Sequence, residues 1–433
     1  MGIPNYNMKI VQSFWSGNTI DINKPYGWFS AKYHWIGWIL GAHQLSRHHP
    51  QVELYTDAYG YEILINVLNL PYSKIHVVLD ELNGYDENLW ALPKIKTYQL
   101  QEAPFIHVDG DVFVWDSLTK GKQDSALIAQ NMEITTAYYS KMWDEIKPHL
   151  LFVPNEFKDY LSKVSNYACN MGVVGGSDIS FFKDFSHKSF DFVDKNKDAW
   201  KDISCTNFNI FFEQVLFYQL AKISSKNIDY IFNEISEDNN YVGFGDFDKV
   251  PDKTYLHLLG DYKRNIGVCR NMEIYIMKYY PDAYSKLISY LENHPNYSEE
   301  NLKPTEKSKQ VDYRLKDSLM SRDLMAEGVP LLLDRLRSSE LPFYIRKYDN
   351  FILQDSNEKT VKIYEANGIF TIYEIDEVDE LMLKEIQIPI RYDDFVTRMK
   401  CYLDNDEDYS EFLLLINNRL RMYISLKIIS IYV

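Results

Sequence analysis

The stretch PFIHVDGDVFVW, residues 104–115, decides the fold of this chain. Its aromatic and β-branched residues predict a buried strand. Three earlier strand candidates, each followed by a helical stretch, are MKIVQSFW (8–15), VELYTD (52–57) and IHVVLDEL (75–82). Strands that alternate with helices predict an α/β fold, a mostly parallel sheet with helices on both faces, in which ligands bind at the carboxyl ends of the strands.

Further along, three more strand candidates and a helix extend this pattern to about residue 295. They are ALIAQN (126–131), NMGVVGG (170–176), TYLHLLG (254–260) and a helix over 272–292. The polar, proline-containing segment that follows is typical of a linker. We therefore predict a first domain over 1–295, a linker over 296–311, and a smaller α+β domain over 312–433 that begins with a helix over 315–327.

The net charge of the chain limits which partners it is expected to bind, and its few cysteines indicate the cellular compartment. The chain has 433 residues, of which 62 are acidic and 46 basic, so its net charge of -16 argues against nucleic acid as a partner. An anionic small molecule needs a local cation or a bound metal to reverse that field. Four scattered cysteines, with neither a signal peptide nor a membrane-spanning segment in the sequence, predict a cytoplasmic protein.

Two aspartates in the deciding stretch predict a metal site. Side chains two residues apart lie on the same side of a strand, so Asp109 and Asp111 are expected to point the same way. Gly110 between them leaves room for a ligand beside the backbone. Two neighbouring carboxylates repel each other unless a cation lies between them, and their oxygens suit Mg²⁺ or Mn²⁺.

A second motif, in the strand candidate 254–260, supplies what the aspartates lack. His257 is a candidate metal ligand, Gly260 allows an anion to approach the backbone, and Lys263 adds a positive charge. A metal, an accessible backbone and a lysine are together what a nucleotide diphosphate requires. The two motifs therefore predict one site for such a ligand.

In this order, the motifs resemble the GT-A fold glycosyltransferases, especially the family 8 type. The resemblance lies in the strand that ends in Asp109-x-Asp111, the later Asn170-x-Gly172 strand, and the motif that begins at His257. It implies a GT-A, Rossmann-like fold and transfer of a sugar from a nucleotide-diphosphate donor, expected to be a uridine diphosphate sugar, with Mn²⁺ or Mg²⁺. The acceptor is left open between a glycan, a peptide and a protein.

The resemblance covers about residues 8–290 and assigns roles by position. One departure is that the last motif continues with Arg264-Asn265 in place of the Pro-Trp of the family. The implied roles are metal ligands for Asp109, Asp111 and His257, diphosphate contacts for Gly260 and Lys263, a donor phosphate or sugar contact for Lys94, a base or ribose contact for Asp57, and donor-sugar contacts for Asn170 and Gly172. Gly172 also has a structural interpretation, as part of a bulge.

The catalytic residues depend on the stereochemistry, which the sequence leaves open. Asp111, through the metal, and Lys263 are expected to stabilise the departing diphosphate in either case. An inverting enzyme also needs a carboxylate base, whereas in a retaining enzyme the leaving phosphate itself can accept the proton. The candidate bases are Glu213 and Asp246, together with Asp178 and Asp248.

Two other functions compete with transfer. The sequence VDGDV also fits the haloacid-dehalogenase phosphatases, with Asp109 as nucleophile, but Asn265 stands where a later acidic motif of that family should end. A non-catalytic sugar-binding protein is the other alternative, supported by the 15% of residues that are aromatic. For the region after the linker, acceptor capture, cover for apolar surface and self-association into a homo-oligomer are all open.

Overall fold

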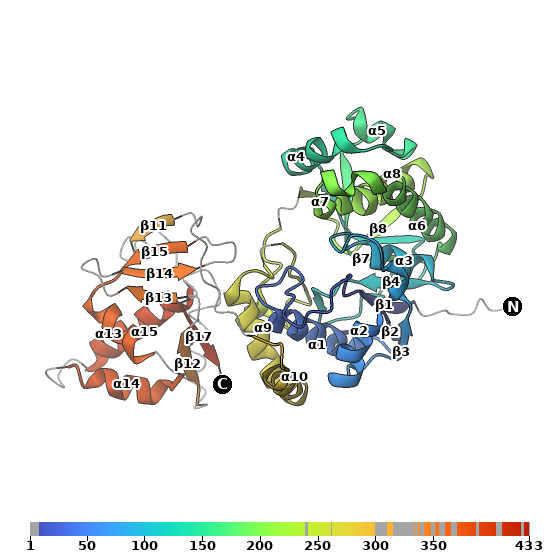
Figure 1. Cartoon of the computed structure of the whole chain (residues 1–433). Helices are drawn as coiled ribbons and strands as arrows, with labels where there is room; N and C mark the ends of the chain where they lie inside the picture. Colours follow the sequence, from blue (N-terminus) through green and yellow to red (C-terminus); the bar gives the residue numbers. More distant parts are fainter. Residues whose placement is uncertain are drawn as a thin grey trace.

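The computed structural model of the chain describes thirteen stretches of it, most of them in the first 298 residues. They are 8–238, 241–260, 262–298, 310–314, 333, 337, 342–347, 351–354, 360–364, 370–386, 389–403, 409–425 and 428–432. In Figure 1 the blue-to-yellow elements of the first 298 residues surround one sheet, and the orange and red elements form a second group. No helix among the described residues is both long enough and apolar enough to cross a bilayer.

An eight-stranded sheet organises the first group. Its order is β3-β2-β1-β4-β7-β6-β8, with β9 beside β6. The bounds are β1 (Lys9–Phe14), β2 (Val52–Thr56), β3 (Lys74–Val77), β4 (Phe105–Val108), β6 (Leu127–Ile134), β7 (Tyr167–Gly176), β8 (Ile228–Tyr230) and β9 (Ser236–Glu237). Strands β1 to β4 are mutually parallel, and β7 is antiparallel to both β4 and β6. The predicted mostly parallel α/β sheet is confirmed, and the order β3-β2-β1-β4 is typical of the GT-A fold.

Helices cover both faces of this sheet, as predicted. Successive side chains of a strand point to opposite faces, so in β1 Ile10 packs into one apolar cluster and Val11 into the other. The first cluster is covered by α1 (Ala31–His48), α2 (Ala58–Tyr61), α9 (Ile266–Tyr279) and α10 (Pro281–Asn293). The second is covered by α3 (Leu92–Gln99), α4 (Ala137–Ile146), α5 (Lys158–Leu161), α6 (Ile179–Asp194), α7 (Cys205–Ile210) and α8 (Leu216–Ile223).

Two predicted elements are each divided in the structure. The strand predicted over 104–115 is β4 followed by a separate strand, β5 (Val112–Val114), which pairs with β10 (Tyr255–His257) in a sheet of its own. The helix predicted over 272–292 is α9 and α10, because Pro281 cannot donate the backbone hydrogen bond that would continue α9. The first of these breaks creates the site described below.

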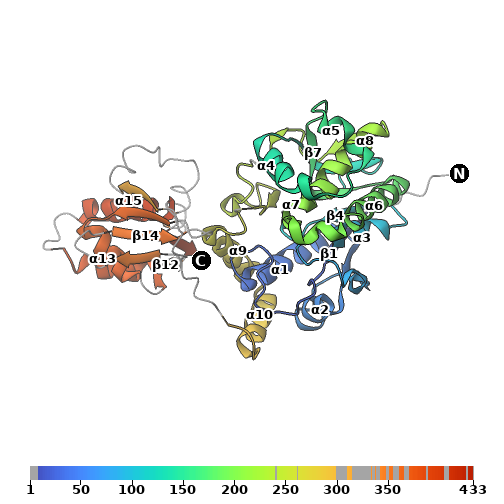
Figure 2. The same cartoon turned by 45° about the horizontal axis from the view of Figure 1, so that its top comes forward.

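The C-terminal elements have an apolar core of their own, from Leu333 to Ile429. Among the described residues of this region, the sheets β11-β15-β14-β13 and β16-β12-β17 accompany the helices α13, α14 and α15 (Figure 2). The bounds are β11 (Gln310–Arg314), β12 (Tyr344–Lys347), β13 (Phe351–Gln354), β14 (Thr360–Tyr364), β15 (Phe370–Glu374), β16 (Ile390–Arg391), β17 (Ile429–Tyr432), α13 (Glu377–Glu385), α14 (Tyr392–Lys400) and α15 (Tyr409–Ser425).

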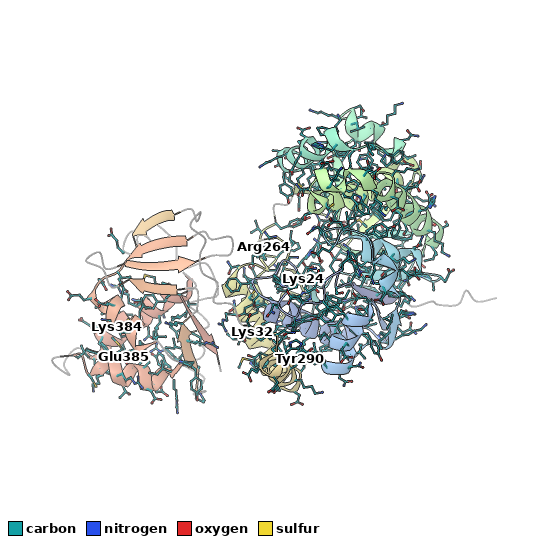
Figure 3. All side chains as sticks on the ribbon, in the orientation of Figure 1. Lys24, Lys32, Arg264, Tyr290, Lys384 and Glu385 are labelled. Atoms are coloured by element: carbon teal, nitrogen blue, oxygen red, sulfur yellow. The ribbon has the colours of Figure 1, made fainter. Side chains whose placement is uncertain are left out.

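Helix α13 shows how this region forms. Its N-cap, Asp376, accepts a hydrogen bond from the backbone of Asp379, and the Asp379 side chain accepts one in return, which is a capping box. Lys384 and Glu385 end the helix (Figure 3). The additional α+β region is thus present as predicted, whereas the helix predicted over 315–327 lies outside the described residues. The domain boundaries stay predictions.

Candidate functional site

The candidate site begins at the carboxyl end of β4, where the chain turns before β5. The backbone N–H of Val112 donates to the carbonyl of Asp109 over 3.1 Å, which closes the turn. Gly110 is required within it, because a Cβ atom there would lie 2.9 Å from the Trp38 indole. Asp109 and Asp111 therefore converge across a tight turn, and not by alternation along a continuous strand as the sequence argument assumed.

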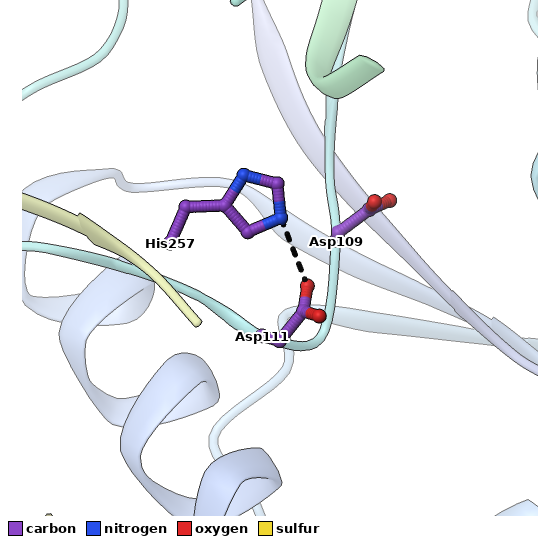
Figure 4. A group of neighbouring side chains, drawn as sticks. All are labelled: Asp109, Asp111 and His257. Atoms are coloured by element: carbon purple, nitrogen blue, oxygen red, sulfur yellow. Dashed lines mark ion pairs between the residues drawn. The ribbon is translucent and has the colours of Figure 1, made fainter. Parts of the chain in front are cut away.

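Pairing between β5 and β10 brings His257 to the two aspartates. His257 lies opposite Val112 in the antiparallel pair, and the N–H of Leu258 donates to the carbonyl of Asp111 over 2.9 Å. The His257 Nε2 is 3.4 Å from the Asp111 Oδ1 (Figure 4). One ligand atom from each of Asp109, Asp111 and His257 lies within 4.8 Å of the others, so three predicted site residues are brought together.

Gln130, which the sequence argument missed, orients the imidazole of His257. Its Oε1 lies 2.8 Å from the His257 Nδ1 and also accepts from the Tyr255 hydroxyl over 2.5 Å. Its amide nitrogen donates to Asn131 over 3.1 Å, so the oxygen is the atom that faces the histidine. Because a carbonyl oxygen only accepts, the Nδ1 carries a proton in either charge state of the ring. The Nε2 faces Asp111: it can donate to that carboxylate when the ring is charged, and it offers a lone pair to a metal when the ring is neutral.

Gly172 makes room for this arrangement. The register of β6 and β7 shifts between Ala129 and Asn131, so Gly172 stands at a bulge, in agreement with its structural interpretation. A Cβ atom on Gly172 would lie 2.4 Å from the His257 Cε1 and 2.7 Å from the Gln130 Oε1. The absence of a side chain at this position is therefore what lets the histidine and its hydrogen-bond partner meet.

We expect Gly172→Ala to weaken Mn²⁺ binding, because the added methyl group must displace His257 or Gln130. Loss of support around a metal ligand typically costs roughly 10–100-fold in affinity, and we expect a loss in that range. Mn²⁺ titration followed by electron paramagnetic resonance measures it. Gly41→Ala is the matched control, because the nearest atom to its Cβ is 3.7 Å away. Equal Mn²⁺ affinity in the Gly172 and Gly41 variants would contradict the prediction.

Two lysines flank the aspartates. The Lys94 Nζ is 3.0 Å from Asp109 and 2.5 Å from Glu213, and it donates to the carbonyl of Met171 over 3.1 Å. The Lys263 Nζ donates to the Asp111 Oδ2 over 2.7 Å. Each aspartate thus has a lysine of its own, and the structure brings these two predicted residues, together with Glu213, into the same site.

Burial and these ion pairs separate the pKa values of the aspartates. Burial raises the pKa of Asp109 to about 7, against the ammonium group of Lys94, which lowers it. Burial also raises the pKa of Asp111, but Lys263 and His257 outweigh burial and hold this pKa well below its usual value. Asp111 therefore holds its negative charge more strongly than Asp109, and Asp109 would gain the most from a nearby cation.

The donor set fits a divalent cation. Two carboxylates supply hard oxygen atoms, and the His257 Nε2 supplies a nitrogen lone pair. The buried Oδ1 of Asp109 accepts no hydrogen bond of good geometry, although the Lys94 Nζ lies 3.0 Å away. An under-coordinated carboxylate oxygen beside an oriented imidazole can serve as a metal ligand.

Asp57 and Gly260 have clear local roles. Asp57 is the N-cap of α2: it accepts from the N–H of Gly60 over 2.8 Å, and from the N–H and hydroxyl of Ser16 over 2.7 and 2.5 Å. These bonds tie the ends of β1 and β2 together. Gly260 has a φ of +54°, in the left-handed region that favours glycine. Whether either residue contacts a nucleotide stays a prediction.

The other candidate bases lie in different surroundings. Asp246 forms ion pairs with Lys249 at 3.0 Å and Lys253 at 3.7 Å. Asp178 is the N-cap of α6 and lies 2.6 Å from the ammonium of Lys226, so it has a structural role. The side chain of Asp248 lies outside the described residues.

The sequence argument also missed Glu133, a buried carboxylate. Burial raises its pKa to about 7, although the hydroxyls of Tyr139 and Tyr241 and the amide of Asn170 lower it by donating hydrogen bonds. Asn170 in turn accepts from the N–H of Gly172 over 3.0 Å. The predicted donor-sugar residues Asn170 and Gly172 are therefore part of a buried polar network beside the metal-ligand group.

Comparison with known proteins gives the following similarities. A protein-family model described as "Family of unknown function (DUF6734)" matches residues 8–290. The galactosyltransferase LgtC, in complex with donor and acceptor sugar analogues, is 14% identical over 65% of this chain and 95% of its own, with a TM-score of 0.32. An active-site mutant of LgtC is 15% identical over 47% and 70%, with a TM-score of 0.28. No curated protein sequence matches the chain.

Proposed function

The chain belongs to DUF6734, a family of unknown function, and we propose that it is a metal-dependent glycosyltransferase. In this proposal it moves a hexose from a nucleotide-diphosphate sugar, expected to be a uridine diphosphate sugar, to an acceptor. The observation that carries the proposal is the convergence of Asp109, Asp111 and His257 with a lysine on each side. Carboxylates, imidazole and ammonium groups in this arrangement suit a metal-bound diphosphate.

Each residue of the site has a separate role in this proposal. A bound Mn²⁺ or Mg²⁺ would neutralise the charge that develops on the departing diphosphate. In this proposal Lys263, now paired with Asp111, turns its ammonium group to that diphosphate, and the left-handed turn at Gly260 would let the diphosphate approach the backbone. Lys94 holds Asp109 in position, with Glu213 as its counter-ion. In this scheme Glu213 acts through Lys94, and Asp246 is the carboxylate we retain as a candidate base.

Nucleotide release from a panel of nucleotide sugars, with Mn²⁺ and with chelator, tests this proposal. We expect release from at least one donor, dependent on the metal and absent in Asp109→Asn. Failure of every donor to bind or react in the presence of Mn²⁺ would contradict transfer. A trapped aspartyl phosphate at Asp109 would instead establish the phosphatase alternative, in which this residue is the nucleophile. The cytoplasm remains our proposal for the compartment.

The C-terminal region supports a further prediction, that it captures the acceptor. The site residues lie between Asp57 and Lys263, and the region from Leu333 onward has its own core, so we propose a separate role for it. A chain that ends at His294 should stay soluble, release nucleotide slowly from donor and water, and lose transfer to the natural acceptor. Transfer at the full-length rate would exclude acceptor capture. Precipitation would favour a role in covering apolar surface of the first domain, and a change in oligomeric state would favour a role in self-association.

A further inference from the structure

One tryptophan differs from all the others in its exposure to solvent. The chain has eight tryptophans, all in described residues, and Trp90 is the one that is exposed, at 39%. The others are buried or half-buried in the apolar clusters. A partly exposed indole ring forgoes part of the gain from burial, and tryptophan is enriched at interfaces, where one side of the ring is apolar and the N–H is polar.

Trp90 also lies at the edge of the metal-ligand group. The Lys94 Nζ is over the indole ring, 5.7 Å from its centroid, and is also 3.0 Å from the Asp109 carboxylate. Lys94 therefore stands between the aspartate and the tryptophan. While Lys94 itself is buried, the ring beyond it reaches solvent. Trp90 therefore offers exposed aromatic surface next to a residue of the site.

The backbone around Trp90 is held in place. The buried side chain of Asn209, on α7, accepts from the N–H of Ala91 over 2.8 Å and donates to the carbonyl of Asn88 over 2.7 Å. These two bonds fix the segment on both sides of the tryptophan to the helix layer. The ring is thus presented on a rigid support, which lowers the entropy cost of binding a ligand on it.

We propose that Trp90 is the platform on which the acceptor stacks, and that the acceptor is a carbohydrate. This inference rests on the proposed function and specifies the acceptor that it left open. The C–H face of a sugar ring is apolar and packs on an aromatic face, while the hydroxyl groups remain available to polar neighbours. The order Asp109, Lys94, Trp90, from the metal-ligand group outward, places the ring where an acceptor would lie, beyond the donor sugar.

Fluorescence of the full-length protein gives a binding test that does not depend on turnover. Lactose, maltose and cellobiose are titrated in the presence of Mn²⁺ and uridine diphosphate. At least one of them should change the tryptophan emission of the native protein and of Tyr279→Ala, a control at another exposed aromatic residue, on α9. Trp90→Phe keeps an aromatic face but removes the indole, and should lose that signal. No signal with any sugar, or an equal signal in Trp90→Phe, would overturn the proposal.

Kinetics of Trp90→Ala separate this inference from the proposed function. We expect the Michaelis constant for the saccharide acceptor to rise by about tenfold, the value of about 1.4 kcal/mol of stacking, and Trp90→Phe to restore most of it. The loss of transfer should exceed the loss of donor hydrolysis by water by the same factor. Equal losses of transfer and of donor hydrolysis, or an unchanged Michaelis constant for the saccharide acceptor, would contradict the role of Trp90 as a stacking platform. Failure of the native protein to bind or react with any donor would overturn the proposed glycosyltransferase activity itself.

Discussion

Asp111→Asn is expected to abolish Mn²⁺-dependent binding of the nucleotide-sugar donor while leaving the fold intact. Asp111 is the carboxylate that Lys263 and His257 hold in its anionic form, so its replacement removes both a ligand and the charge that offsets the ion. Loss of groups that only support a ligand costs about 10–100-fold in affinity, so loss of the ligand itself should exceed 100-fold. Calorimetric titration of donor with and without Mn²⁺ measures the effect.

The control for this experiment is Asp191→Asn, which removes a carboxylate from an exposed ion pair with Lys195 outside the metal-ligand group. The melting temperatures of both variants show whether either has lost its fold. Donor affinity in Asp111→Asn that equals that of the native protein, with or without chelator, would refute the assignment of the metal site.

Lys263→Ala should lower the turnover rate more than it weakens donor binding. The charge of Lys263 matters most as the diphosphate departs, because negative charge develops there in the transition state. Loss of one preorganised cation should reduce the rate on the order of 100-fold or more. Steady-state measurement of kcat and the Michaelis constant over a range of donor concentrations provides the comparison.

Lys195→Ala is the control for charge alone, since Lys195 is an exposed lysine paired with Asp191 on the surface of α6. If Lys263→Ala raised the Michaelis constant and left kcat unchanged, Lys263 would contribute equally to ground state and transition state, and its role on the leaving group would be refuted.

Much of the site could be predicted because its residues follow strands. The order of strands and helices indicated which chain ends meet at one edge of the sheet, and Asp109 and Asp111 follow β4 at that edge. His257 reaches them from β10, which pairs with β5 in a separate sheet. The turn at Gly110 was not visible, since a strand pattern of period two is the same whether or not a turn interrupts it. The aspartates converge as predicted, but for a different physical reason.

Gln130 and Glu133 could not be found in the same way. Both are polar residues in a strand whose pattern is otherwise apolar, and no spacing marks them as partners of a distant histidine or tyrosine. Their contacts depend on the register shift between β6 and β7, which forms between segments far apart in the chain. A polar residue inside an apolar strand is the signal that would have singled them out, because buried polar groups need partners.

The contact between Lys263 and Asp111 has a consequence for the order in which ligands can assemble. The ammonium group occupies the carboxylate that a cation would need, so a cation that arrives alone competes with the protein's own lysine. A diphosphate gives that lysine a different partner and frees the carboxylate. Cation and nucleotide should then assist each other, and by thermodynamic reciprocity each must raise the affinity of the other by the same factor. Because of Lys263, stable binding of the cation would then depend on a bound nucleotide.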